Sequence, residues 1–223
     1  MPATIVMLPG YMTDADLWHE FAPGLAPYVP QHAQLHGSSL EDIARGVLRD
    51  CPARFVLLGF SLGGYVAQEI VRLAGDRVLA LVLVATSARA GTPPSQLSPV
   101  QGRFKGLTAA SVRSSLGPQR QDDGELIARI QRMGERLGEQ VYRDQSGLVR
   151  ESGLPALEQV RCPVLVVAAR HDALRTIEES REMVQAAGAD FELIEDSGHM
   201  LPMEQPQQLA RIVVRWLDRV LSA

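Results

Sequence analysis

Ser61 occupies a sequence context that is suited to nucleophilic catalysis. It is the third residue of Gly-Phe-Ser-Leu-Gly at positions 59–63, between an apolar run and a helix-forming segment. A G-x-S-x-G sequence at a strand-to-helix turn is typical of a nucleophile elbow. Glycines at 59 and 63 keep the turn free of side chains that would collide with neighbouring backbone. The serine would then stand at a helix N-terminus, where developing negative charge is stabilised.

Two further residues fit the roles of base and acid. A serine hydroxyl needs a base to take its proton and an acid to orient that base. His199 lies between the last expected strand and the last expected helix, and Asp172 follows the expected strand at 164–168. Because parallel strands end at one edge of a sheet, we expect Ser61, Asp172 and His199 to meet there.

Other residues compete for these roles. Asp196 is a rival acid, but it lies three positions before His199 and would have to fold back to reach the ring. His19 and His36 are expected on the surface, and His171 is expected to be a neighbour of the site only. The simpler interpretation of the leading candidates is a loop histidine bonded to backbone and an aspartate in a solvated turn.

An oxyanion intermediate also needs hydrogen-bond donors. The sequence predicts the backbone N–H of Leu62, directly after the serine, as the first donor. The second should come from the loop after the first strand, where Gly10 permits a sharp turn. We expect the N–H of Tyr11 there, with Met12 as the alternative.

Strand and helix patterns alternate along most of the chain, which predicts an α/β fold with a parallel sheet. Short apolar runs that suit strands buried on both faces occur at 5–8, 55–58, 79–85, 164–168 and, more weakly, 191–194. Helical patterns occur at 40–49, after a possible capping box, and at 62–73, 177–187 and 207–220.

The segment from 87 to 160 breaks this alternation. It has no convincing strand, and it opens with a Pro/Gly/Ser-rich stretch at 91–95. A helical stripe follows, formed by Leu126, Ile130, Met133, Leu137 and Val141. We therefore predict a core formed by residues 1–86 and 161–223, and a helical insertion at 87–160.

Composition restricts the class of function. The net charge is −4 without a basic tract, so nothing indicates nucleic acid or an anionic membrane surface. Cys51 and Cys162 form no C-x-x-C or Cys/His cluster, so we expect free thiols and no metal site. The N-terminus lacks a signal-peptide pattern, so we expect a cytoplasmic location. The oligomeric state is not predicted.

Together these residues resemble the α/β-hydrolase superfamily, and within it the small capped esterases and lactonases grouped with pimeloyl-carrier-protein methyl ester esterase and 3-oxoadipate enol-lactonase. The order Ser, Asp, His along the chain is that of this superfamily. The resemblance implies a mostly parallel sheet, here of about six strands, with helices on both faces and a helical cap. The residues that carry it are 8–11, Trp18, 59–64, 81–84, Asp172, 198–199 and 204–206.

Three departures from the superfamily weaken any transfer of substrate identity. Pro9-Gly10 replaces the usual His-Gly of the oxyanion loop, and the first antiparallel strands are missing. Thr176 stands where a proline often follows the acid.

The resulting hypothesis is a serine hydrolase that cleaves a small-molecule carboxylic ester, thioester or lactone through an acyl-enzyme on Ser61, without cofactor. One alternative is hydrolysis or lysis of a carbon–carbon bond by the same three residues. Another is a ligand-binding protein that retains the fold without turnover.

Overall fold

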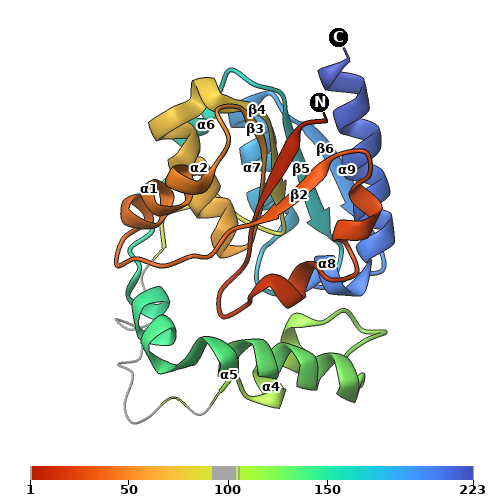
Figure 1. Cartoon of the computed structure of the whole chain (residues 1–223). Coiled ribbons are helices and arrows are strands. Elements are labelled where there is room, and N and C mark those ends of the chain that lie inside the picture. Colours follow the sequence, from red (N-terminus) through yellow and green to blue (C-terminus); the bar gives the residue numbers. More distant parts are fainter. Residues whose placement is uncertain (1, 92–103, 105, 223) are drawn as a thin grey trace.

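A six-stranded, wholly parallel sheet forms the centre of the computed structural model, which describes residues 2–91, 104 and 106–222. The strand order is β2-β1-β3-β4-β5-β6 (Figure 1). The expected α/β class and number of strands are confirmed. The strands are β1 (Thr4–Leu8), β2 (Val29–His32), β3 (Phe55–Phe60), β4 (Val78–Val84), β5 (Val164–Ala169) and β6 (Asp190–Ile194).

Helices cover both faces of the sheet and form two apolar clusters with it. On one face lie α1 (Leu40–Asp50), α2 (Leu62–Ala74), α6 (Leu154–Glu158) and α7 (Ile177–Ala187). On the other lie α9 (Pro206–Leu221), α8 (Leu201–Glu204) and the 3₁₀ turns η1 (Ala15–Trp18) and η2 (Ala22–Leu25). A third turn, η3 (Gly75–Arg77), links α2 to β4. The continuous apolar strands are buried on both faces, as a covered parallel sheet requires.

Two helix starts follow the expected capping chemistry. The hydroxyl of Ser39 accepts the N–H of Asp42 at the start of α1. Thr176 caps α7 and forms a complete capping box with Glu179. These caps fix where the chain leaves the loops at the strand ends and enters each helix.

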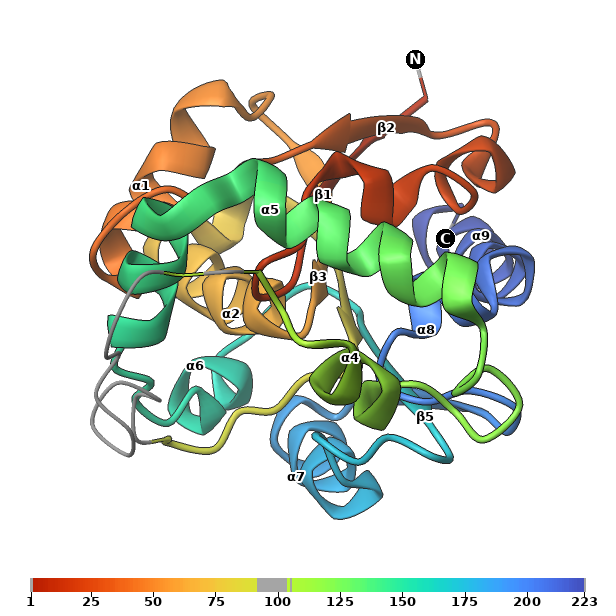
Figure 2. The ribbon, with the colours of Figure 1, turned by 90° about the horizontal axis from the view of Figure 1, so that it is seen from below.

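The insertion provides two further helices, α4 (Ala109–Ser115) and α5 (Gly124–Gly147), which lie across the end of the sheet where the strands finish (Figures 1 and 2). Its described part adds no strand to the sheet, although Gly91 and Arg150 form an isolated bridge. Apart from Gly91, the Pro/Gly/Ser-rich stretch lies outside the described residues. The division of the chain at 87 and 160 stays a prediction, and α6 packs on α2 and α7 of the core.

The stripe on α5 differs from the continuous helix that its spacing predicts. Gly138 has φ 77° and ψ −174°, so two helical pieces meet at a break. Leu126, Ile130 and Met133, before the break, are buried, whereas Leu137 is only half-buried. Glycine reaches positive φ at little cost, and this lets the second piece turn toward the start of the chain.

The cysteines and the helices also bear on what the sequence predicts. Cys51 and Cys162 are both free and half-buried, and burial raises the pKa of each thiol to about 11. None of the helices within the described ranges has the length and apolar character that crossing a bilayer requires.

Candidate active site

Ser61 stands at the turn from β3 into α2 in a strained backbone conformation. Its φ is 51° and its ψ is −113°, values that non-glycine residues rarely adopt. The surroundings hold this conformation: the Ser61 N–H donates to the carbonyl of Val84 (3.0 Å), and the Thr86 hydroxyl donates to the carbonyl of Ser61 (2.7 Å). Strain kept in this way is common where a side chain must be presented for a function.

The glycines around Ser61 are required by close backbone approach. A Cβ added at Gly59 would lie 2.5 Å from the carbonyl oxygen of Gly63, and one at Gly63 would collide with the carbonyl of Leu8. A Cβ at Gly10 would lie 2.7 Å from the ring of Phe60. These contacts bring the loop after β1 against the Ser61 turn, in agreement with the reason predicted for glycine at 59 and 63.

The structure brings Ser61, His199 and Asp172 together in one hydrogen-bonded chain. The Nε2 atom of His199 lies 2.9 Å from the Ser61 hydroxyl oxygen, and its Nδ1 lies 2.8 Å from Oδ2 of Asp172. All three side chains are nearly inaccessible to water: Ser61 is 8% exposed, and the His199 and Asp172 side chains are 7% and 1% exposed. This geometry suits transfer of the serine proton to an oriented imidazole.

Asp172 is fixed by the backbone that follows it. Its Oδ1 accepts the N–H groups of Leu174 (2.8 Å) and Arg175 (2.9 Å), which leaves Oδ2 for His199. Asp196 is instead exposed, and its carboxylate accepts a hydrogen bond from the Gln119 amide. The lower rank given to Asp196 therefore agrees with the geometry.

The backbone N–H groups expected to bind an oxyanion differ in whether they already donate a hydrogen bond. The N–H of Met12 donates to Oε1 of Gln145 at 2.8 Å, so it is occupied. Among the described residues, the structure gives the N–H groups of Tyr11 and Leu62 no acceptor. Of the two alternatives in this loop, Tyr11 is thus the one with an available donor. Its phenol contacts the Ser146 hydroxyl at 2.7 Å, and burial raises the pKa of that phenol to about 12.

Gln145 and Glu204 support the site in roles that the sequence did not indicate. Gln145 is 3% exposed and lies in the second piece of α5. Glu204 is 5% exposed, and its carboxylate accepts the N–H of Gly198 (3.0 Å) and of Gly117 (2.7 Å). Burial raises its pKa above the ordinary glutamate value. Glu204 thereby ties the loop of His199 to the insertion, a tertiary link that local patterns do not reveal.

A cavity of about 420 Å³ opens over Ser61 and His199. Insertion residues Leu107, Val112 and Ile130 form part of its apolar wall. Leu126, Ile130 and Met133 all belong to the packed core, and of these three stripe residues Ile130 also lines the cavity. Arg150 and Arg175 add two cationic side chains to the lining.

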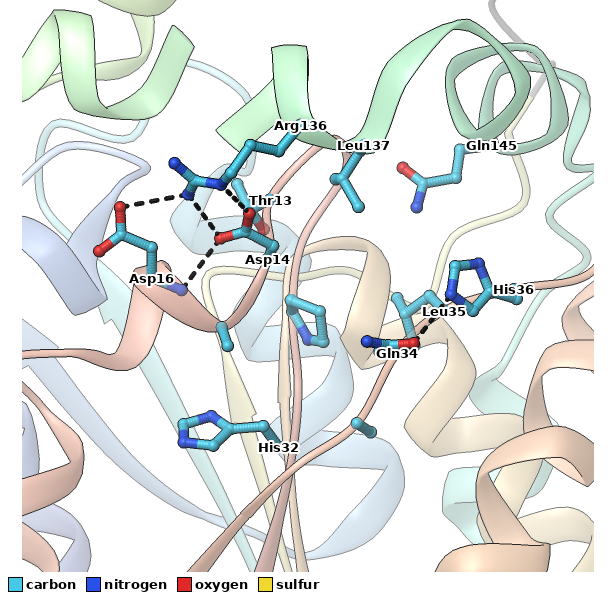
Figure 3. Close-up of a pocket in the computed structure, with 13 residues that line it drawn as sticks. Thr13, Asp14, Asp16, His32, Gln34, Leu35, His36, Arg136, Leu137 and Gln145 are labelled. Carbon is cyan, nitrogen blue, oxygen red and sulfur yellow. Dashed lines mark hydrogen bonds and ion pairs between the residues drawn. The ribbon is translucent and has the colours of Figure 1, made fainter. Parts of the chain in front are cut away.

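A second cavity of about 560 Å³ shares Thr13 with the first but does not include Ser61 (Figure 3). In this region Arg136 reaches from α5 to the carboxylates of Asp14 and Asp16. Gln145, which accepts the Met12 N–H, also lines this cavity. These contacts hold α5 against the loop that carries Tyr11.

Within the part of the chain that the structure describes, no group of three or more His, Cys, Asp or Glu side chains is arranged to hold a metal ion. The polar groups around Ser61 are those of acyl-transfer chemistry: a hydroxyl, an imidazole, a carboxylate and two backbone donors.

Known proteins with similar sequences or folds include esterases and a lactonase. The model of the alpha/beta hydrolase family matches residues 5–212. A pimeloyl-[acyl-carrier protein] methyl ester esterase of Pectobacterium carotovorum is 30% identical over 168 residues, which cover 69% of this chain and 62% of that protein. The match thus spans less than two thirds of that relative's length.

Solved structures agree in fold. A thermophilic esterase from Thermogutta terrifontis, solved with malate bound, matches with a TM-score of 0.85 and 23% identity over 99% of this chain and 91% of that one. The enol-lactonase from Burkholderia xenovorans matches with a TM-score of 0.82 and 20% identity over 97% of this chain and 92% of that one. At such identities these structures establish the shared fold.

Proposed function

This chain belongs to the α/β hydrolase family, and we propose that it hydrolyses a carboxylic ester, thioester or lactone through an acyl-enzyme on Ser61. The observation that carries the proposal is the hydrogen-bonded chain from Ser61 through His199 to Asp172, in which Ser61 and His199 line one cavity. Relatives that are named esterases and a lactonase support the substrate class.

In the first half of the reaction, the Ser61 oxygen attacks the carbonyl carbon while Nε2 of His199 takes the hydroxyl proton. Asp172 keeps Nδ1–H directed toward its carboxylate and stabilises the imidazolium that forms. Collapse of the tetrahedral intermediate breaks the bond to the leaving group, which receives the proton from His199. An ester releases an alcohol, and a thioester releases a thiol.

In the second half, water attacks the acyl-enzyme and gives its proton to the same imidazole. Collapse of the second tetrahedral intermediate breaks its bond to the Ser61 oxygen, which takes the proton back from His199, and releases the carboxylic acid. In both halves the N–H groups of Leu62 and Tyr11 stabilise the oxyanion. Each such donor is typically worth about 3–4 kcal/mol of transition-state stabilisation.

The first experiment tests whether Ser61 is an activated nucleophile. We expect a fluorophosphonate probe to label the wild-type protein at Ser61, as intact-mass and peptide mass spectrometry would show. Ser61→Ala should abolish both labelling and ester hydrolysis, with a loss of turnover of about 10³-fold or more. Ser114→Ala is the matched control, because Ser114 lines the same cavity but makes no hydrogen bond to His199.

A substrate panel separates the alternative functions. Methyl and p-nitrophenyl esters, thioesters and lactones should be turned over, whereas β-diketones that require carbon–carbon cleavage should not. Turnover of β-diketones alone would overturn the ester assignment. Ligand binding without any labelling of Ser61 would favour a binding protein over an enzyme.

A further inference from the structure

Two arginines on the wall of the Ser61 cavity lack the partners that such side chains normally have. Arg150 lies just after the insertion's long helix α5, and Arg175 lies in the loop after Asp172. Both line the cavity together with Ser61 and His199. They come from segments on either side of strand β5, so the fold brings two cations to one wall.

Neither guanidinium has an acidic partner in the part of the chain that the structure describes. Within the described residues, no carboxylate oxygen comes within ion-pair distance of Arg150 or Arg175, and each buried Nε has no acceptor. The one side-chain hydrogen bond of the two runs from Nη1 of Arg175 to the carbonyl of Leu174 at 3.2 Å. The sequence at 92–103 and 105 contains no aspartate or glutamate.

The other half-buried arginines that the structure describes do have acceptors, so the lack of a partner is specific to the two arginines of the cavity. In the described ranges, Arg120 pairs with Asp123, and Arg129 pairs with Asp16 and Glu20. Arg77 donates to backbone carbonyls between helix α1 and strand β3. A guanidinium withdrawn from water without an acceptor destabilises the protein, because its lost hydration is not replaced. Arg150 and Arg175 destabilise the protein in this way.

An aromatic ring compensates part of this cost. The guanidinium carbons of Arg150 and Arg175 lie 5.5 and 5.7 Å from the centroid of the Tyr65 ring. Contacts of this kind stabilise cations but leave their N–H donors unused. Burial, followed by the neighbouring charge of Arg175, lowers the pKa of the Arg150 guanidinium. Both guanidinium groups therefore lie against one aromatic ring, with N–H donors still available for a ligand.

We propose that Arg150 and Arg175 form an anion subsite that selects substrates carrying a carboxylate, so that the substrate is a hemiester of a dicarboxylic acid or a carboxylate-bearing lactone. The proposal rests on the proposed function, since it names the substrate class for the same cavity. A carboxylate accepts paired N–H donors from guanidinium and neutralises the two adjacent charges. The rest of the acyl chain would lie along the apolar wall that includes Ile130 and Leu107.

The main test compares matched esters. We would measure kcat/KM for monomethyl succinate, glutarate, adipate and pimelate against the dimethyl esters of the same acids. The hemiester of best length should be preferred by at least about tenfold, the effect expected of a charge-assisted hydrogen bond. Arg150→Gln and Arg175→Gln should each reduce this preference, and the double variant should bring it to about one.

The control is Arg170→Gln. Arg170 is exposed, pairs with Glu195 and does not line the cavity, so removing it deletes the same charge elsewhere on the same loop. The Arg170→Gln variant should prefer hemiesters as strongly as the wild type does.

A second set of substrates uses neutral acyl chains esterified to 3-hydroxypropyl phosphate. A preference for that ester over hemiesters would overturn the assignment of the anion to the acyl side.

A binding measurement separates this proposal from the proposed function. Adipate should bind to Ser61→Ala in calorimetry more tightly than the neutral dimethyl adipate, and the preference should disappear in the Ser61→Ala/Arg150→Gln/Arg175→Gln protein. That comparison requires no turnover. Equal binding of adipate and dimethyl adipate would overturn the anion subsite even if esters are hydrolysed, whereas adipate binding without hydrolysis would count against the proposed function alone. Circular dichroism of each variant would verify its fold.

Discussion

Two sets of polar groups belong to the Ser61 cavity. We call Ser61, His199 and Asp172 its Ser61 end, and Arg150 and Arg175 its arginine end. The two sets differ in whether their hydrogen-bonding groups already have partners. At the Ser61 end, His199 uses both ring nitrogens, and Asp172 uses both carboxylate oxygens. At the other end, Arg150 and Arg175 are buried at Nε without an acceptor. The first end is organised before any ligand arrives. The second has N–H donors for which a ligand would supply the acceptor. We therefore assign bond breaking to the first end and substrate selection to the second.

This difference gives a kinetic criterion. Groups that are already oriented act mainly on the transition state, so removing them should lower kcat. Groups that have no partner until the substrate binds act on substrate binding, so removing them should change the enzyme's preference among substrates. Variants at the two ends should therefore separate in steady-state kinetics.

Among the variants that compare the two ends, the largest effect is expected from Asp172→Asn. An amide in place of the carboxylate favours the wrong tautomer of His199 and stabilises its protonated form less, so kcat should fall by about 10⁴-fold. Adipate binding to the variant should remain, because asparagine keeps an oxygen that can accept the N–H groups of Leu174 and Arg175. Stopped-flow or steady-state kinetics and calorimetry measure the two quantities.

Asp196→Asn is the matched control for that variant. Asp196 lies three residues before His199 but is exposed and contacts Gln119, so its removal should leave kcat within about twofold. If Asp196→Asn proved as damaging as Asp172→Asn, the assignment of the acid would be wrong. If Asp172→Asn lost adipate binding as strongly as turnover, the separation of the two ends would fail.

Much of the Ser61 end could be predicted from sequence because its signals are local. Each of Ser61, Asp172 and His199 follows a strand, and parallel strands end at one edge. The glycines at 59 and 63 indicate a close approach of backbone. Strand β2 was not predicted, since Val-Pro-Gln-His at 29–32 is an edge strand without an apolar run.

The remaining features depend on contacts between distant segments. The spacing of apolar residues on α5 continues past Gly138, so periodicity alone does not reveal the break there. Gln145 meets Met12 across 133 positions, and Glu204 meets Gly117 across 87. Likewise, whether Arg150 has a carboxylate partner is decided by tertiary packing. Local patterns indicate the groups that we propose to react, but not the residues that hold them or that we propose to select the ligand.

A smaller effect is expected from Gln145→Leu, which tests how the oxyanion loop is held. The change leaves the buried N–H of Met12 without an acceptor, and a loop that moves to satisfy it would displace the N–H of Tyr11. We expect kcat to fall about tenfold, with little change in KM and no change in hemiester preference. A rise in KM with unchanged kcat would contradict this positioning role. Gln140→Leu is the control, as Gln140 is an exposed residue of the same helix.

The smallest effect is expected from Glu204→Gln, which tests the buried carboxylate that joins the His199 loop to the insertion. An amide keeps one acceptor oxygen but turns an N–H group toward Gly117 or Gly198. Loss of that hydrogen bond destabilises the fold, while removal of a buried charge stabilises it. At pH 7 the free energy of unfolding should therefore change by only about 1 kcal/mol.

The pH dependence of this variant gives the sharper test. Burial raises the pKa of Glu204 in the folded protein above 4.5, so the folded state binds its proton more readily than the unfolded state. The resulting stabilisation is fully present below pH 4.5 and is lost as pH rises through the folded pKa. The wild type should thus gain stability relative to Glu204→Gln as pH falls from 8 toward 5, as urea unfolding at each pH would show. If the wild type lost stability relative to the variant over this range, the bonds from Gly117 and Gly198 would outweigh burial, and the pKa of Glu204 would be lowered by folding instead of raised.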